Sequence, residues 1–212
     1  MRKFSVIIGS SLADITMKLI LACMAVVLLS SAVELARPMR RQRKSIAQIY
    51  GDITPVPEQI LEVSFGDLVV TPGMEVRPGD AMEMPCIDFD YDPGCYYTFM
   101  EISHTWPYPK DPFLSPSVLA MYVNMYGDSD MGISMSDSCE IASYVPPCPP
   151  PGSGSHQYLM YVYKQKGVID TTNEELLSYQ INRSVFSLDD FAKTYKLSGP
   201  VAGCFFNSTY PV

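Results

Sequence analysis

"GSGSHQYLMYVYKQ", residues 152–165, is the stretch that says most about how this chain folds. Two glycines precede His156, and a run of tyrosine, leucine, methionine and valine follows it as far as Tyr163. β-Branched and aromatic residues favour strands, and a Gly-Ser segment in front of such a run is typical of a loop. The stretch therefore predicts a loop that leads into one long strand, with His156 at the start of that strand.

Shorter runs of the same kind occur elsewhere in the chain. We predict strands in the following segments: 60–66, 68–73, 82–90, 95–103 and 118–127. The third and fourth of these read as a hairpin, because an Asp-Pro-Gly turn separates them.

Prolines and one helix complete this pattern. Residues 107–117 and 143–154 are too rich in proline for regular structure, because proline removes a backbone donor. Residues 187–197 form the only helix that we expect, with Ser187 as its N-cap and two aspartates in its first turn. The order of elements predicts a mainly β fold.

The composition limits both the size of the fold and its partners. With 212 residues, 47% of them hydrophobic, the chain can form one well-packed domain or at most two small ones. The formal net charge of -8 argues against nucleic acid as a partner, because binding to phosphates requires a cationic surface.

The N-terminal part has the pattern of a secretory signal peptide. Within residues 17–36, Lys18 comes first, an apolar stretch follows over 19–33, and small residues end the segment. An uncleaved membrane anchor is the alternative interpretation, although the apolar stretch is short for a helix that crosses a bilayer.

This pattern divides the chain into three parts. We expect residues 1–36 to be the signal peptide, with Met17 as an alternative start, 37–58 to be a basic linker or propeptide, and 59–212 to be the folded domain. The protein would then be secreted. Asn182 and Asn207 begin Asn-x-Ser/Thr triplets, which would be glycosylated if they were exposed in a secreted chain.

The cysteines agree with export. Cys86 and Cys95 flank the Asp-Pro-Gly turn, and Cys139 and Cys148 have the same spacing, which leaves Cys204 over. Two local disulfides are one interpretation, because disulfides persist in oxidising compartments, and five buried thiols are the other.

Four segments carry a resemblance to a known family. They are KDP at 110–112, VNMYG at 123–127, YVPPCPPPGSGSHQY at 144–158 and FAKTYKLSGPVAGCFF at 191–206. With these segments in this order, the chain resembles the phosphatidylethanolamine-binding protein (PEBP) family, which includes the Raf kinase inhibitor proteins. The resemblance implies a large antiparallel sheet, a smaller sheet packed against it and helices near the C-terminus.

The resemblance also implies an anion-binding pocket at the end of the large sheet. Its parts are an Asp-Pro-Asp-x-Pro segment, a histidine on the next strand and the histidine of a Gly-x-His-Arg motif. Here the first segment keeps only Pro107, the second histidine falls at Val118 or Leu119, and Gln157 replaces the arginine. Acids and arginine are lost together, so no desolvated charge is left without a partner.

Neutral hydrogen-bonding groups occupy the family's pocket positions instead. The candidate ligand-binding residues are His156, Tyr158, Pro149, Pro150, Ser103, His104, Thr105 and Pro107. We expect the two histidines to lie near each other, where they could bind an anion when protonated near pH 6, or a metal ion if further ligands joined them. A pocket that no longer binds anything is the other interpretation.

These observations favour a binding protein over an enzyme. We predict a secreted, monomeric PEBP-like protein that binds a small anion, a phospholipid headgroup or a hydrophobic small molecule, and we expect no cofactor. The alternative is an interaction protein or protease inhibitor that acts on an extracellular partner through its surface loops. Ser153 and Ser155 lie near His156, but no oxyanion-hole motif accompanies them. Trp106 either covers an apolar ligand or packs among the prolines.

Overall fold

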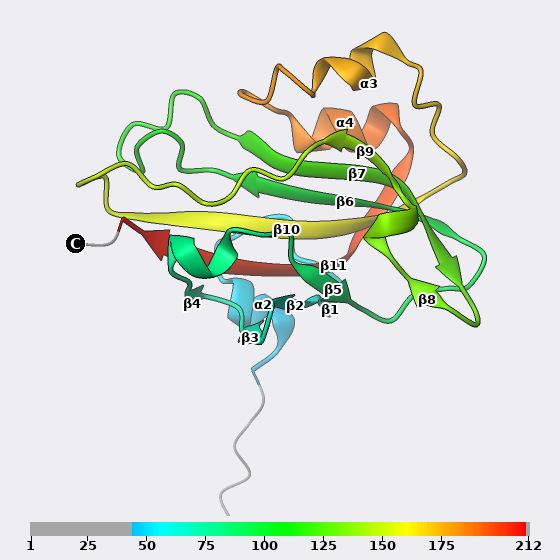
Figure 1. Ribbon diagram of the computed structural model, residues 1–212, viewed down its shortest axis with the longest axis horizontal. Coiled ribbons are helices and arrows are strands. Elements are labelled where there is room, and N and C mark those ends of the chain that lie inside the picture. Colours follow the sequence, from blue (N-terminus) through cyan, green and yellow to red (C-terminus); the bar gives the residue numbers. More distant parts are fainter. Residues whose placement is uncertain (1–43, 211–212) are drawn as a thin grey trace, which may run out of the picture. The chain divides into compact units, whose positions relative to one another are not determined.

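One large sheet contains most of the strands (Figure 1). The computed structural model describes residues 44–210. The large sheet consists of β1 (Gln59–Ile60), β4 (Met74–Glu75), β6 (Tyr96–Ser103), β7 (Ser117–Asp128), β8 (Gly132–Ile133), β9 (Cys139–Ala142), β10 (Ser155–Gln165) and β11 (Leu197–Thr209). Its order is β1-β11-β10-β6-β7-β8, with β4 pairing also with β11 and β9 with β7. The four long strands at its centre pair antiparallel, as predicted.

A second, smaller sheet has the order β3-β2-β5. Its strands are β2 (Glu62–Phe65), β3 (Leu68–Val70) and β5 (Cys86–Asp88). Phe65 of this sheet packs edge-on against Phe206 of β11, with ring centroids 5.7 Å apart. The two sheets therefore share one hydrophobic core.

The strand β10 shows why the long apolar run lies at the centre of the molecule. Residues 158–163 are all buried, although alternate side chains point to opposite faces of the sheet. Tyr158, Met160 and Val162 belong to the core beneath the small sheet, whereas Leu159, Tyr161 and Tyr163 belong to the core beneath the helices. A strand that is covered on both faces needs apolar residues at every position, and this requirement explains the unbroken run.

Short helices cover the second face. They are α2 (Ile46–Tyr50), α3 (Glu174–Ser178) and α4 (Leu188–Thr194), and two 3-10 turns, η1 (Pro78–Ala81) and η2 (Met135–Asp137), lie elsewhere. The expected helix is α4, and the Ser187 hydroxyl accepts from the Asp190 amide as its N-cap. The sequence did not predict α3, which Asn173 caps in the same way. In Figure 1, α3 and α4 lie together on the side of the large sheet away from β2 and β3.

The segment before β1, which we expected to be linker or propeptide, is packed in its described part. Tyr50 of α2 is 2% exposed, and its ring meets that of Phe205 edge-on at 5.1 Å. The Tyr161 hydroxyl donates to the Pro55 carbonyl at 3.0 Å. Residues 45–58 are therefore part of the folded unit, because their aromatic side chain completes the core beneath the helices.

The signal peptide, its alternative start and the first part of the linker lie outside the described residues. Among residues 44–210, none of the helices has the length and apolar character that a bilayer span requires.

The predicted hairpin over residues 82–103 is wrong, and the expected disulfides are not formed. β5 pairs with β2 in the small sheet, whereas β6 pairs with β7 and β10 in the large one. Cys86 thus lies in β5 of the small sheet, whereas Cys95 immediately precedes β6 of the large sheet, and all five described cysteines are free. Cys139 begins β9, and Cys148 lies in the irregular segment that follows this strand.

The two glycosylation candidates differ in their surroundings. Asn182 is exposed in the segment after α3. Asn207 is half-buried within β11, where its side-chain amide donates to the Gly73 carbonyl at 3.3 Å. Asn182 is therefore the more accessible of the two, and glycosylation at either position stays a prediction.

Candidate functional site

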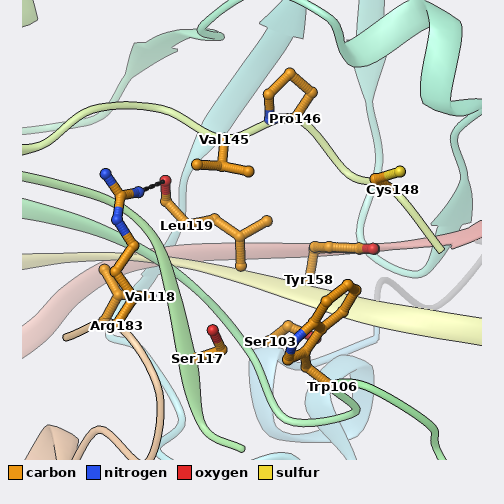
Figure 2. A pocket seen from close by; sticks show the side chains of 10 residues that line it. All are labelled: Ser103, Trp106, Ser117, Val118, Leu119, Val145, Pro146, Cys148, Tyr158 and Arg183. Carbon is orange, nitrogen blue, oxygen red and sulfur yellow. Dashed lines mark hydrogen bonds between the residues drawn. The ribbon is translucent and has the colours of Figure 1, made fainter. Parts of the chain in front are cut away.

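A cavity of about 200 Å³ opens where three central strands meet the loops (Figure 2). β6 contributes its last residue, Ser103, and the strand register places Ser103 between Tyr158 of β10 and Ser117 of β7. The complete lining is Ser103, Trp106, Ser117, Val118, Leu119, Val145, Pro146, Cys148, Tyr158 and Arg183. The cavity thus lies at the end of the large sheet, where the sequence predicted a pocket.

Apolar side chains dominate this lining. Leu119 lies between Val145 and Tyr158 in Figure 2, and the ring of Trp106 closes the side near Ser103. The Ser115 side chain holds the backbone of Trp106 in place. The Trp106 amide donates to the Ser115 hydroxyl at 2.8 Å, and the Trp106 carbonyl accepts from that hydroxyl at 2.9 Å. The cavity is small and mainly hydrophobic, as is typical of sites for small molecules.

A chain of hydroxyl groups holds His156 beside the cavity. The Ser153 hydroxyl donates to the Pro150 carbonyl at 2.7 Å, because a carbonyl can only accept. Its oxygen therefore accepts from Nε2–H of His156, which is also 2.7 Å away. A neutral imidazole with the proton on Nε2 accepts at Nδ1, and the Thr105 hydroxyl lies 3.3 Å from that atom. The Thr105 oxygen then accepts from the Ser103 hydroxyl at 3.1 Å.

This chain assigns one direction to every proton in it. Burial lowers the pKa of His156, which keeps the ring in the neutral form that the chain requires. Ser153 is not an activated nucleophile, because His156 donates a proton to it instead of accepting one. Ser103 directs its hydrogen to Thr105, so it offers the cavity a lone pair and no donor.

The predicted site residues divide into three groups. Ser103 and Tyr158 line the cavity. Thr105 and His156 lie behind the lining, and His156 is completely buried. The remaining candidates, Pro149, Pro150, Pro107 and His104, do not line it. Of these, Pro150 serves the hydroxyl chain through its carbonyl.

The expectation that two histidines face one cleft is wrong. His104 is exposed and borders a different, wider hollow together with Pro116, Phe186 and Leu188. The residues that follow each other along an extended segment point to opposite sides, so Ser103 faces the cavity and His104 turns away from it. Burial lowers the pKa of His156, which disfavours the protonated form that would bind an anion.

The sequence did not predict that an arginine reaches the cavity. Arg183 lies in the segment between α3 and α4, and its guanidinium donates to the carbonyls of Leu119 and Ser143 at 3.2 and 2.7 Å. With further bonds to the Ser143 hydroxyl and the Gln180 carbonyl, it makes four hydrogen bonds to the protein. Arg183 therefore ties the loops around the cavity together, and little of its hydrogen-bonding capacity of five N–H groups is left for a ligand.

A buried carboxyl group lies on β6, the strand whose last residue lines the cavity. Glu101 precedes Ser103 by two residues on β6, and its exposed fraction is 0%. Neither of its carboxylate oxygens has a hydrogen-bond partner among the described residues. Burial raises the pKa of Glu101 to about 8, so the group is uncharged at neutral pH.

Comparisons with known proteins agree with this architecture. A family model described as phosphatidylethanolamine-binding protein matches residues 116–206. The "Putative odorant-binding protein A5" of Drosophila melanogaster is 26% identical over 174 residues, which are 81% of this chain and 80% of that protein.

Two solved structures share the fold. One is a carboxypeptidase Y inhibitor complexed with its cognate proteinase, with a TM-score of 0.61 and 19% identity over 73% of this chain and 85% of that one. The other is the phosphatidylethanolamine-binding protein from Plasmodium vivax, with a TM-score of 0.50 and 13% identity over 75% and 91% of the two chains.

Proposed function

Because this chain belongs to the phosphatidylethanolamine-binding protein family, we propose that it binds a small, mainly apolar molecule in the cavity beside Trp106. The apolar lining carries this proposal, because the side chains of Leu119, Val145 and Trp106 offer a ligand mainly hydrophobic surface. The similarity to a protein named for odorant binding supports the same class of ligand.

A small anion or a phospholipid headgroup, which the sequence suggested, has less support. Both ring nitrogens of His156 are engaged with protein hydroxyls. Four hydrogen bonds direct the Arg183 guanidinium at the protein. An anion would therefore have to break existing hydrogen bonds before it gained new ones.

Secretion, a monomeric state and the lack of enzymatic activity remain parts of the proposal. Secretion rests on the signal-like segment 17–36. The proton direction in the hydroxyl chain supports a binding protein, because the Ser153–His156 pair is arranged for structure and not for nucleophilic attack.

Two of the protein's own residues report on occupancy of the cavity. Trp106 is the only tryptophan and lines the cavity, and the thiol of Cys148 lines it too. We expect hexan-1-ol to change the fluorescence of Trp106 saturably and to slow alkylation of Cys148. Cys86 serves as the internal control, because it is exposed on β5 and does not line the cavity.

A variant that fills the cavity tests the location of the site. Val145→Phe adds bulk at the wall, where Val145 is 44% exposed, and we expect it to weaken hexan-1-ol binding at least tenfold. Val69→Phe is the matched control, because Val69 is exposed on β3 of the small sheet. Equal binding by both variants, or equal protection of Cys148 and Cys86, would contradict the proposal. A stable complex with a protease, with no ligand bound in the cavity, would favour the alternative of an inhibitor that acts through its loops.

A further inference from the structure

Glu101 faces the same side of the sheet as the cavity. Residues two apart on a strand point to the same face, so the side chains of Glu101 and Ser103 lie on one face of β6, with their Cα atoms about 7 Å apart. Its neighbours across the strands are Met160 of β10 and Ala120 of β7. Tyr158 lies diagonally opposite and lines the cavity itself.

No other described group satisfies this carboxyl. Both oxygens are buried without a hydrogen-bond partner, which is rare for a polar side chain in a folded protein. The titratable side chains close enough to influence it electrostatically are Tyr144 and Tyr158. Burial raises the pKa of both tyrosines, so both are uncharged over the range in which Glu101 titrates. The Tyr144 hydroxyl already donates to the Ala81 carbonyl at 2.7 Å.

Glu101 does not line the cavity itself, but it lies two residues before the lining residue Ser103 on the same face of β6, and both side chains can act as acceptors. Ser103 directs its hydrogen to Thr105 and presents a lone pair, and Glu101 becomes a pure acceptor when it ionises. A ligand with a hydrogen-bond donor at its tip matches these two groups better than a ligand that can only accept.

We propose that Glu101 selects the ligand, and that the cavity binds a small apolar amine whose ammonium group pairs with the Glu101 carboxylate. This inference rests on the proposed function and specifies the ligand of the same cavity. The side chain of Glu101 turns about its three rotatable bonds toward Ser103, and the alkyl part of the amine lies against Leu119 and Val145. The amine would contribute the partner that the carboxyl group lacks in the empty protein.

Pairing with an ammonium ion requires the buried acid to lose its proton. The ligand enters as R–NH₃⁺, Glu101 passes from COOH to COO⁻, and one proton leaves to the solvent. Affinity for the amine should therefore increase about tenfold with each unit by which the pH rises, until the pH reaches the pKa of Glu101, which burial raises to about 8. An alcohol of the same chain length takes up and releases no proton, so its affinity should not depend on pH.

Titration of the full-length protein with hexylamine and with hexan-1-ol, followed by Trp106 fluorescence at pH 6 and pH 7, tests this assignment. We expect hexylamine to bind at least tenfold more tightly than hexan-1-ol at pH 7. Calorimetry in buffers of different ionisation enthalpy should show the release of one proton with the amine and none with the alcohol.

Three variants separate the carboxyl group from general effects. Glu101→Leu and the isosteric Glu101→Gln should both bind the alcohol as before, but lose the preference for the amine and its dependence on pH. Glu83→Leu should keep both, because Glu83 is an exposed carboxylate elsewhere on the surface. Glu101→Gln preserves the shape of the side chain if Glu101→Leu packs poorly.

The outcomes are distinguishable. Binding of the alcohol without any preference for the amine would overturn the role of Glu101 and leave the apolar pocket standing. An amine preference that survives in both Glu101 variants would also overturn it. Binding of neither ligand would overturn the pocket and the role of Glu101 together.

Discussion

Single residues decide the chemical character of this site. Ser103 and Thr105 stand where related proteins were expected to carry acids, and the two hydroxyls bond to each other and to His156. The carboxyl group that lies nearby belongs to Glu101, two residues before Ser103 on β6, and burial keeps it uncharged at neutral pH. A carboxyl in water and a carboxyl in a hydrophobic core differ in charge at the same pH, because burial penalises the ionised form.

Glu101 should make the stability of the protein depend on pH. Its pKa is near 4.5 when unfolded and about 8 when folded, so the folded state holds a proton that the unfolded state has lost between these values. The stabilising effect is complete below about pH 4.5 and is lost as the pH rises through about 8. We expect the free energy of unfolding to fall by up to about 1.4 kcal/mol for each pH unit in this window. Urea unfolding at intervals between pH 5 and pH 8 measures it.

The variant Glu101→Leu supplies the contrast. A leucine in this core position does not titrate, so the free energy of unfolding should fall less with rising pH in this variant than in the wild type. Replacement of an unpartnered buried carboxyl by an apolar side chain should also raise stability at pH 8. An unchanged pH profile in Glu101→Leu would show that other groups cause the decline.

At the scale of elements, the loop before β10 and the strand itself act as one unit. Ser153 in the loop accepts from His156 in the strand, and Thr105 after β6 closes the other side of the ring. The loop over 149–154 is thus joined to β10 and to the segment after β6 through the imidazole of His156. This arrangement holds the wall of the cavity without a salt bridge.

Removing one hydroxyl of this unit should leave a buried donor without a partner. Ser153→Ala removes the acceptor for Nε2–H of His156, and we expect a loss of about 1–3 kcal/mol in the free energy of unfolding. Ser155→Ala is the control, because Ser155 is exposed and has no side-chain hydrogen bond among the described residues. Nitrogen NMR of the imidazole should show the proton on Nε2 in the wild type. A proton on Nδ1 would contradict the assigned direction of the chain.

At the scale of the whole molecule, the folded unit begins well before β1. α2 brings Tyr50 against Phe205 of β11, and Pro55 accepts from Tyr161 of β10. The segment thus covers the same face of the large sheet that α4 covers. A shortened chain that starts at residue 59 would expose this part of the core.

The N-terminal segment should therefore contribute to stability. Tyr50→Ala removes a ring that is 2% exposed, and we expect it to cost roughly 3 kcal/mol in the free energy of unfolding. Val56→Ala, in the same segment but 40% exposed, should cost no more than about 0.5 kcal/mol. Chemical denaturation of the two variants side by side measures the difference. Equal stabilities would mean that the segment packs without supporting the core.

The sequence by itself determined the scaffold of this protein. The apolar run of β10 and the cap at Ser187 are local signals, and local signals suffice to define a buried strand and the start of a helix. The resemblance of four segments then indicated a large antiparallel sheet with a smaller sheet packed against it, and the end of the large sheet at which a pocket lies.

Only the tertiary structure decided which groups meet at that pocket. Arg183 reaches Leu119 across 64 positions of the chain, and Thr105 reaches His156 across 51. It also separated groups that are close in sequence, because β5 and β6 entered different sheets and His104 turned away from Ser103. Such contacts depend on strand register and on the direction in which each side chain leaves its strand, and neither property is encoded in the spacing of residues along the chain.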